Sequence, residues 1–314
     1  MQVVRAVETP RRNNTALCSR DLIMPYFVRG GENVKEPVLS MPGIERFSVD
    51  NLIRDIEQNR SVKKVLLFGL AEQKDELGSD AYGAGSPVQR AIKAIKKNFD
   101  DLTVITDICV CGYTTHGHCR ILNDGTNEFD KSATLKALSK IALLHAEAGC
   151  DLVAPSAMME GQVGAIREAL DRQGFRDTGI LAYSAKYRSS LYGPFRDAQN
   201  SSLEFGGKRP YQLDSGSVDE ALSRIERDIA QGADMIMVKP ALFYLDVIQR
   251  VKRKFDVPLT AYSVSGEYSM IKKLAGEDKS LERDIALEAL RSIKRAGADL
   301  IINYFAREAS VWVA

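Results

Sequence analysis

The sequence lacks both the long apolar runs of a membrane protein and the charge excess of a nucleic-acid-binding protein. No stretch approaches the roughly 20 apolar residues that a membrane-spanning helix needs. Residues 1–14 are polar and contain no signal-peptide apolar centre. The 43 basic and 42 acidic side chains leave a net charge of +1, too little for a general attraction to nucleic acid or anionic membranes. We therefore expect a cytoplasmic protein with a small-molecule partner.

A disulfide framework and a dinucleotide-binding motif are also missing. The chain has five cysteines, an odd number, and three of them lie between positions 109 and 119, which favours thiols or metal ligands over disulfides. No G-x-G-x-x-G follows the first predicted strand, which argues against an open, doubly wound sheet. At 314 residues the chain could still form two average domains or one large barrel.

Short apolar runs alternate with amphipathic stretches along the chain. The runs predict strands at 22–28, 64–69, 102–110, 151–155, 179–185, 235–239, 258–264 and 300–305. The amphipathic stretches predict helices at 49–59, 88–99, 132–148, 163–172, 218–231, 244–255 and 281–296. This order predicts an α/β fold, a (β/α)8 TIM barrel over residues 21–314, with residues 1–20 as a short N-terminal arm or a disordered tail.

Glycines and long loops refine this prediction. Gly149, Gly232 and Gly297 each stand between a predicted helix and a buried strand, where a helix C-cap is expected. The loops at 111–130 and 187–217 follow strands and are unusually long. Because the loops after the strands form the active-site face of a barrel, we expect these two to be functional.

The segment TDICVCGYTTHGHC, residues 106–119, is the densest cluster of reactive side chains. Strand geometry places Asp107, Cys109 and Cys111 on one face, and Cys119 can return to them across a glycine-containing turn. Three thiolates favour zinc and leave a fourth ligand position for water or substrate. The C-x-C-x₇-C spacing differs from the C-x₂-C pair of a zinc finger, so we favour a catalytic metal over buried, reduced cysteines.

Two lysines each end a predicted strand, Lys186 in LAYSAK and Lys239 in MIMVKP. Adjacent strands would bring both to one barrel mouth. Desolvation and a neighbouring cation lower the pKa of a lysine, and the free amine can then form a Schiff base with a carbonyl. The alternative for either lysine alone is a salt-bridged residue at the barrel rim.

The loop around Tyr192, Phe195 and Arg196 continues to Lys208 and Gln212. Basic side chains on a loop over a barrel mouth suit a carboxylate substrate, although an ordinary solvated loop has the same composition. Hydroxyl groups end the last strands, at Tyr262, Ser265 and Tyr304. They could hold a second carboxylate or only satisfy the strand ends.

Six motifs are similar to those of the porphobilinogen synthase (5-aminolevulinate dehydratase) family, namely TDICVCGYTTHGHC, APSAMMEGQV, YSAKYRSSLYGPFRDA, GADMIMVKP, YSVSGEYSMI and RAGADLIINYF. The resemblance runs from about Asp21 to Phe305. It implies a (β/α)8 barrel with an N-terminal arm through which a homo-octamer assembles. It also implies a hydro-lyase that condenses two 5-aminolevulinate molecules into porphobilinogen in tetrapyrrole and heme biosynthesis.

The resemblance also implies a role for each candidate residue. Lys239 would form the Schiff base with the first substrate molecule, Lys186 would engage the second, and Asp107 would be an active-site acid. The carboxylate of the second substrate molecule would be bound by Arg196, Lys208 and Gln212. The carboxylate of the first would be bound by Ser265 and Tyr304, in a pocket lined by Tyr192, Phe195 and Tyr262. The Zn²⁺ ligands would be Cys109, Cys111 and Cys119.

Four features depart from the family pattern. Lys208 stands where arginine is usual, Ala157 replaces an aspartate, and the arm is short and lacks its usual Arg-Pro-rich start. Arg224 occupies the position of the glutamate that marks a regulatory magnesium site, so we expect no allosteric Mg²⁺. Two alternative functions remain, a class I aldolase, which needs no zinc, and a catalytically impaired metal-binding barrel.

Overall fold

The computed structural model describes residues 16–123, 126, 128–201 and 211–313, and eight parallel strands within them close into a barrel. Neighbouring strands follow one another along the chain, and the last pairs with the first. These strands are β1 (Leu22–Val28), β4 (Lys64–Gly69), β5 (Thr103–Ile108), β8 (Leu152–Pro155), β9 (Gly179–Lys186), β10 (Met235–Lys239), β11 (Leu259–Tyr262) and β12 (Leu300–Ile302). The predicted (β/α)8 barrel is confirmed.

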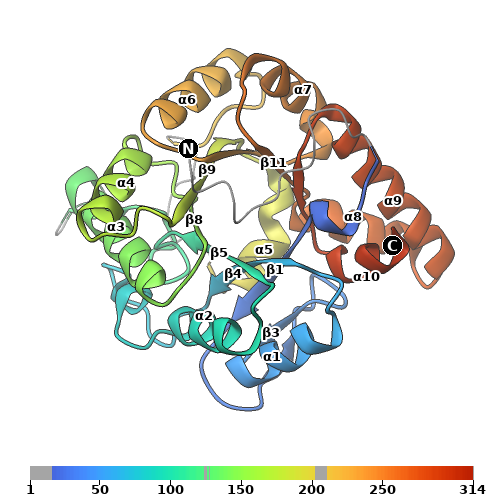
Figure 1. Ribbon diagram of the computed structural model, residues 1–314, viewed down its shortest axis with the longest axis horizontal. Helices are drawn as coiled ribbons and strands as arrows, with labels where there is room; N and C mark the ends of the chain where they lie inside the picture. The colour runs from blue at the N-terminus through green and yellow to red at the C-terminus, as the bar shows by residue number, and fades with distance from the viewer. Residues whose placement is uncertain (1–15, 124–125, 127, 202–210, 314) are drawn as a thin grey trace.

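Helices surround the barrel as an outer ring (Figure 1). The seven predicted helices are present as α1 (Val49–Gln58), α2 (Pro87–Asn98), α3 (Lys131–Glu147), α4 (Gln162–Arg172), α6 (Val218–Ala230), α7 (Leu245–Lys254) and α9 (Lys279–Ala296). Three further α-helices were not predicted, namely α5 (Gly193–Ala198), α8 (Ser265–Ala275) and α10 (Ala306–Trp312). Short 3₁₀ helices lie at Ser19–Asp21, Ser79–Tyr82, Ser190–Tyr192 and Leu242–Tyr244.

Two hairpins add to the barrel. Antiparallel β2 (Lys35–Pro37) and β3 (Glu45–Phe47) attach to the barrel because β3 pairs with β1. Strands β6 (Ile121–Leu122) and β7 (Phe129–Asp130) form the second hairpin, inside the long loop predicted at 111–130. The other predicted loop, 187–217, is helical in part, because it contains a 3₁₀ turn and α5.

The three predicted C-cap glycines are confirmed, with φ values of 100° at Gly149, 97° at Gly232 and 120° at Gly297. L-residues with side chains rarely adopt this left-handed backbone, whereas glycine does so at little cost. Each glycine therefore ends a helix and turns the chain into the next strand.

An aspartate stands two residues after each of these glycines, and hydrogen bonds from it hold the next strand to its neighbour. Asp299 donates its backbone N–H to the Leu259 carbonyl oxygen at 2.8 Å and accepts the Leu259 N–H on its carboxylate, also at 2.8 Å. Asp151 does the same with Val104, and Asp234 with Ile180. This reciprocal pair of bonds fixes the register of adjacent strands at the amino-terminal end of the barrel.

A buried ion pair lies where the barrel closes between β12 and β1. Lys294 Nζ is 3.1 Å from Asp21 Oδ2, and both side chains are almost fully buried. We expect Asp21→Asn to lower the free energy of unfolding by about 3 kcal/mol, because the lysine charge would be left buried without its partner. Urea denaturation measures this, with Glu168→Gln, which breaks an exposed pair, as the control. Equal losses in the two variants would contradict the prediction.

Among the described residues, no helix combines the length and apolar character needed to cross a membrane. The predicted arm lies largely outside the described residues, so the boundary at residues 20 and 21 stays a prediction.

Candidate active site

The two predicted lysines lie side by side where β9 and β10 end. Lys186 and Lys239 are register partners across the two parallel strands, and they are only 8% and 4% exposed. Both strands are continuous apolar runs, which explains why each lysine is carried into the interior at the carboxyl edge of the sheet. The predicted juxtaposition is confirmed.

Aromatic rings enclose the Lys239 ammonium group. Its Nζ lies 4.1 Å from the ring centre of Tyr262, 5.0 Å from Phe195, 5.2 Å from Tyr192 and 5.3 Å from Tyr183. The faces of aromatic rings attract a cation, while their bulk keeps water away from the amine. The structure thus brings the predicted pocket residues Tyr192, Phe195 and Tyr262 together around the predicted nucleophile.

Lys186 and Asp107 lie beside this enclosure. Lys186 Nζ donates to the Ser156 carbonyl oxygen at 2.8 Å. Burial raises the pKa of Asp107 to about 6, opposed by a hydrogen bond from Ser156 and by the charges of Lys186 and Lys239. Asp107 Oδ1 has no hydrogen-bond partner among the described residues. The site therefore holds an acid that is poised between its two protonation states beside two amines.

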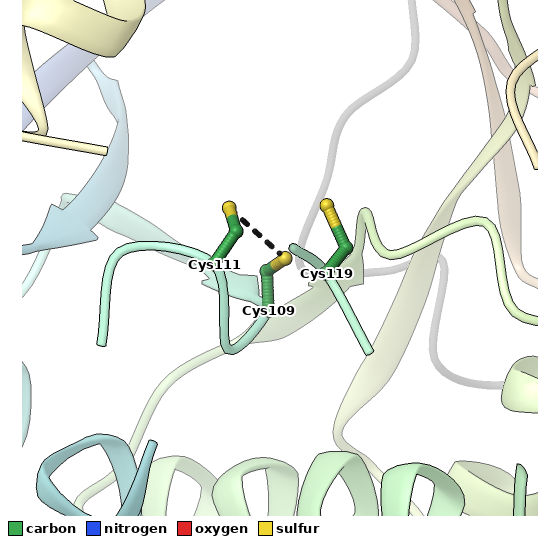
Figure 2. Close-up of side chains that lie close together, drawn as sticks. All are labelled: Cys109, Cys111 and Cys119. Atoms are coloured by element: carbon green, nitrogen blue, oxygen red, sulfur yellow. Dashed lines mark hydrogen bonds between the residues drawn. The ribbon is translucent and has the colours of Figure 1, made fainter. Parts of the chain in front are cut away.

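Figure 2 shows the three cysteine side chains gathered around one space. The sulfur atoms of Cys109, Cys111 and Cys119 lie within 4.8 Å of one another, and all three residues are buried. Hydrogen bonds with the other two thiols, together with burial, raise the pKa of Cys109 well above its usual range. Three clustered sulfur ligands are the donor set of a soft metal such as zinc, so these residues could hold a metal.

The two histidines of the motif shape the loop beside the cysteines. His118 donates its backbone N–H to His116 Nδ1 at 3.1 Å, and His118 Nδ1 lies 3.3 Å from the Tyr211 hydroxyl. Both histidines are buried. Their contacts fold the turn that returns Cys119 to the other thiols.

Residues 190–201, which we call the closing segment, cover the barrel mouth. Its helix α5 lies inside the outer ring of helices (Figure 1), and the Phe195 ring contacts Phe27 of β1 and Phe68 of β4. The pocket beneath is lined by Phe68, Asp107, Cys111, Ser156, Lys186, Tyr192, Phe195, Arg196, Gln199, Ser201, Gln212 and Lys239. Arg196 and Gln212 are therefore at the site as predicted, whereas Lys208 lies outside the described residues.

Sequence reasoning missed Phe68, Ser156, Gln199 and Ser201 as pocket residues. Ser156 stands in the APS motif directly after β8, and the carboxyl end of a barrel strand is where active-site residues are expected. Gln199 and Ser201 depend on the path of the closing segment, which no sequence pattern revealed.

The predicted hydroxyl groups lie next to the pocket but are already bonded. Ser265 Oγ accepts the Phe195 N–H at 3.0 Å and donates to the Leu191 carbonyl oxygen at 3.1 Å. The Tyr262 and Tyr304 hydroxyls are 3.1 Å apart. Ser265 thus ties the closing segment to α8, in addition to any contact with a ligand.

Glu267 is a buried acid that the sequence analysis missed. Its carboxylate accepts the backbone N–H groups of Leu242 at 2.6 Å, Ala241 at 3.2 Å and Val264. The first two follow Lys239 along the chain, and the third precedes Ser265. Glu267 therefore joins the segments that follow two neighbouring strands, β10 and β11.

The pKa of Glu267 predicts a pH-dependent stability. Burial raises this pKa from 4.5 to about 7, opposed by the backbone hydrogen bonds. The unfolded chain releases the proton near pH 4.5, whereas the folded protein holds it until about pH 7. Stability from this group is therefore complete below about pH 4.5 and is lost as the pH rises from about 4.5 to about 7, by up to about 3 kcal/mol.

Urea denaturation across that range tests this. The free energy of unfolding should fall with pH more steeply in the wild type than in Glu267→Gln, which does not titrate. The exposed Glu57→Gln variant is the control and should follow the wild type. Parallel curves for the wild type and Glu267→Gln would contradict the prediction.

Arg46 of β3 holds the closing segment from outside the pocket. This side chain is buried, and it donates from Nε to the Ala198 carbonyl oxygen at 2.8 Å and from Nη2 to the Asp197 carbonyl oxygen at 2.7 Å. These carbonyls end α5, and a guanidinium there satisfies groups that the helix leaves unpaired. The helix that carries Phe195 and Arg196 is thereby fixed.

Comparison with known proteins identifies related chains. Residues 3–312 match the family model described as delta-aminolevulinic acid dehydratase. Proteins of that name from Archaeoglobus fulgidus and Synechococcus elongatus are 49% and 46% identical to this chain. The alignments cover 93% and 99% of it, and 90% and 97% of the relatives.

Comparison with solved structures agrees with the sequence comparison. The Toxoplasma gondii delta-aminolevulinic acid dehydratase (porphobilinogen synthase), in complex with the reaction product porphobilinogen, superposes with a TM-score of 0.92 at 41% identity, covering 96% of this chain and 86% of that one. The carboxyl transferase domain of Rhizobium etli pyruvate carboxylase reaches a TM-score of 0.51 at 11% identity and supports the barrel fold alone.

Proposed function

The chain belongs to the delta-aminolevulinic acid dehydratase family, and from this premise we propose that it condenses two molecules of 5-aminolevulinate into porphobilinogen in tetrapyrrole and heme biosynthesis. The reaction releases two waters, as in a hydro-lyase. The observation that carries the proposal is the pair Lys186 and Lys239, buried side by side at the barrel mouth next to three clustered thiols.

We propose that Lys239 is the nucleophile. Its free amine attacks the keto carbon of the first substrate molecule, a carbon–nitrogen bond forms, and the carbonyl oxygen leaves as water. The rings around Nζ keep bulk water from hydrolysing the resulting Schiff base. Lys186 engages the second molecule, and Asp107, beside both amines, accepts or returns protons.

The carboxylates of the substrates need cationic or hydroxyl partners. Arg196 and Gln212 line the pocket and are proposed to bind the carboxylate of the second molecule together with Lys208. Ser265 and Tyr304 are proposed for the first carboxylate. Ser265 would then exchange its present bonds with the closing segment for a bond to the substrate.

Cys109, Cys111 and Cys119 would hold the metal, which we propose to be Zn²⁺, because three soft sulfur donors favour it. When bound, zinc supplies a Lewis acid that orients the second substrate molecule. At the position that marks regulatory magnesium in the family, Arg224 instead donates to the Tyr211 carbonyl oxygen at 2.9 Å. We therefore propose that there is no magnesium site at this position.

We also propose that the protein is a cytoplasmic homo-octamer assembled through the arm. Light scattering can check the number of subunits.

The test is porphobilinogen formation from 5-aminolevulinate by one preparation, measured as purified, after chelation and after zinc is restored. Activity that disappears and returns with zinc is the expected result. Activity that is indifferent to chelation would remove the metal from the mechanism and favour the aldolase-like chemistry of the lysines alone. Metal binding without turnover would leave the catalytically impaired barrel.

A further inference from the structure

Gln199 is a pocket residue to which the chemistry above assigns no role. It follows α5 directly, is 3% exposed, and lines the pocket together with Cys111 and Arg196. Its amide lies over Gly112, since a Cβ atom added there would be 3.5 Å from Gln199 Cδ and Nε2. The amide therefore lies against the residue that follows Cys111, on the cysteine side of the pocket.

The amide oxygen of Gln199 is buried without a hydrogen-bond partner among the described residues. Native proteins rarely leave a buried acceptor unpaired, because the group loses its bond to water and gains nothing in return. In the wall of a pocket, such an oxygen is available to a donor that arrives with a ligand.

Hydrogen bonds hold the backbone of Gln199 in place. The Gln199 N–H donates to the Phe195 carbonyl oxygen at 3.0 Å, and Arg46 binds the two carbonyls just before it. Asn200, with φ at 50°, then turns the chain away. The backbone that carries the side chain is thus ordered before a ligand arrives, and the amide is buried against Gly112, so a bond to its oxygen costs little further ordering.

The side chains that line the pocket determine which group of a ligand would bond to Gln199 Oε1. Lys186, Lys239 and Arg196 supply nitrogen donors to the pocket, so a ligand amino group must find its acceptors among the other lining residues. Asp107 is one acceptor, beside the lysines, and Gln199 is another, beside Cys111. An amide oxygen accepts from both the neutral and the protonated form of an amine.

We propose that Gln199 Oε1 accepts a hydrogen bond from the amino group of the 5-aminolevulinate molecule bound on the cysteine side of the pocket, and so selects substrates that carry this group. The inference rests on the proposed function and deepens it.

The experiment measures KM and kcat for Gln199→Met, which keeps the size of the side chain but removes the acceptor, and for Gln199→Glu, which keeps the acceptor. Gln199→Met should raise KM for 5-aminolevulinate about three- to tenfold, the range of one lost hydrogen bond, with kcat within about twofold. Gln199→Glu should stay near the wild-type KM. The exposed Gln173→Ala variant is the control.

Inhibition by 4-oxopentanoate, which lacks the amino group, separates recognition from packing. Its inhibition constant should be the same in the wild type and in Gln199→Met. An unchanged KM in Gln199→Met, or weaker 4-oxopentanoate inhibition in that variant, would overturn the inference. If Gln199→Met does not fold, as judged by circular dichroism, Gln199→Ala replaces it under the same criteria. A wild type that forms no porphobilinogen would instead overturn the proposed function.

Discussion

Lys239→Met should lower kcat for porphobilinogen formation by about a thousandfold or more, because it removes the only atom proposed to bond covalently to the first substrate. Methionine fills a similar volume among the rings of Tyr183, Tyr192, Phe195 and Tyr262, so the fold should persist. Borohydride reduction in the presence of 5-aminolevulinate should add substrate mass to one lysine in the wild type, and peptide mass spectrometry should locate it at Lys239.

Lys140→Met is the matched control for this variant. Lys140 is also a lysine over an aromatic ring, with Nζ 4.5 Å from the ring centre of Tyr82, but on the outer face of α3. Its loss should change neither kcat nor trapping. If borohydride trapped the substrate at Lys186 alone, or trapped it fully in Lys239→Met, the first Schiff base would not form at Lys239.

Cys109→Ser should abolish stoichiometric metal binding and lower activity at limiting zinc by about a hundredfold or more, since a hydroxyl is a poor replacement for a thiolate on zinc. Cys109 is the most informative position, because its sulfur lies 3.3 Å from that of Cys111 and within 4.8 Å of that of Cys119. Metal analysis after dialysis gives the zinc content. Cobalt substitution adds a second readout, since a thiolate-to-cobalt charge-transfer band should be present in the wild type and weaker in the variant.

Cys150→Ser serves as the control, because Cys150 is a buried cysteine outside the cluster. It should keep the wild-type zinc content and activity. If Cys109→Ser bound zinc as tightly as the wild type, or if chelation left activity intact, the cysteines would have a structural role and the lysines would act without metal.

Periodicity predicted most of the fold because barrel strands are buried on both faces and therefore appear as continuous apolar runs. Helix α8 escaped prediction for a physical reason. Its second residue is Gly266, a poor helix former, and a Cβ atom there would lie 2.6 Å from the backbone of Leu191. The glycine is needed because the closing segment packs closely against it. In the sequence it lies just after the strand predicted at 258–264, so the pattern around it indicated the end of a strand and not the start of a helix.

The candidate site was predictable where its residues lie on strand ends or within one motif. The three cysteines share one short segment, and the register of adjacent strands places Lys186 beside Lys239. Residues that act through distant contacts gave no such signal, as Glu267 and Arg46 show, because their roles depend on which carbonyl or N–H group the fold brings to them. The bonds of Ser265 to the closing segment likewise depend on tertiary structure.

The contact between Arg46 and the Ala198 carbonyl oxygen joins residues 152 positions apart. The hairpin that carries Arg46 pairs with the first barrel strand, whereas α5 follows the fifth, so the mouth of the pocket takes its final shape only when these distant parts of the chain have met. In genetic terms, a missense change at Arg46 therefore belongs with defects of the active site. The hairpin contacts no reacting atom, yet loss of the Arg46 side chain would impair substrate affinity. Changes in surface hairpins, in contrast, commonly give a neutral phenotype.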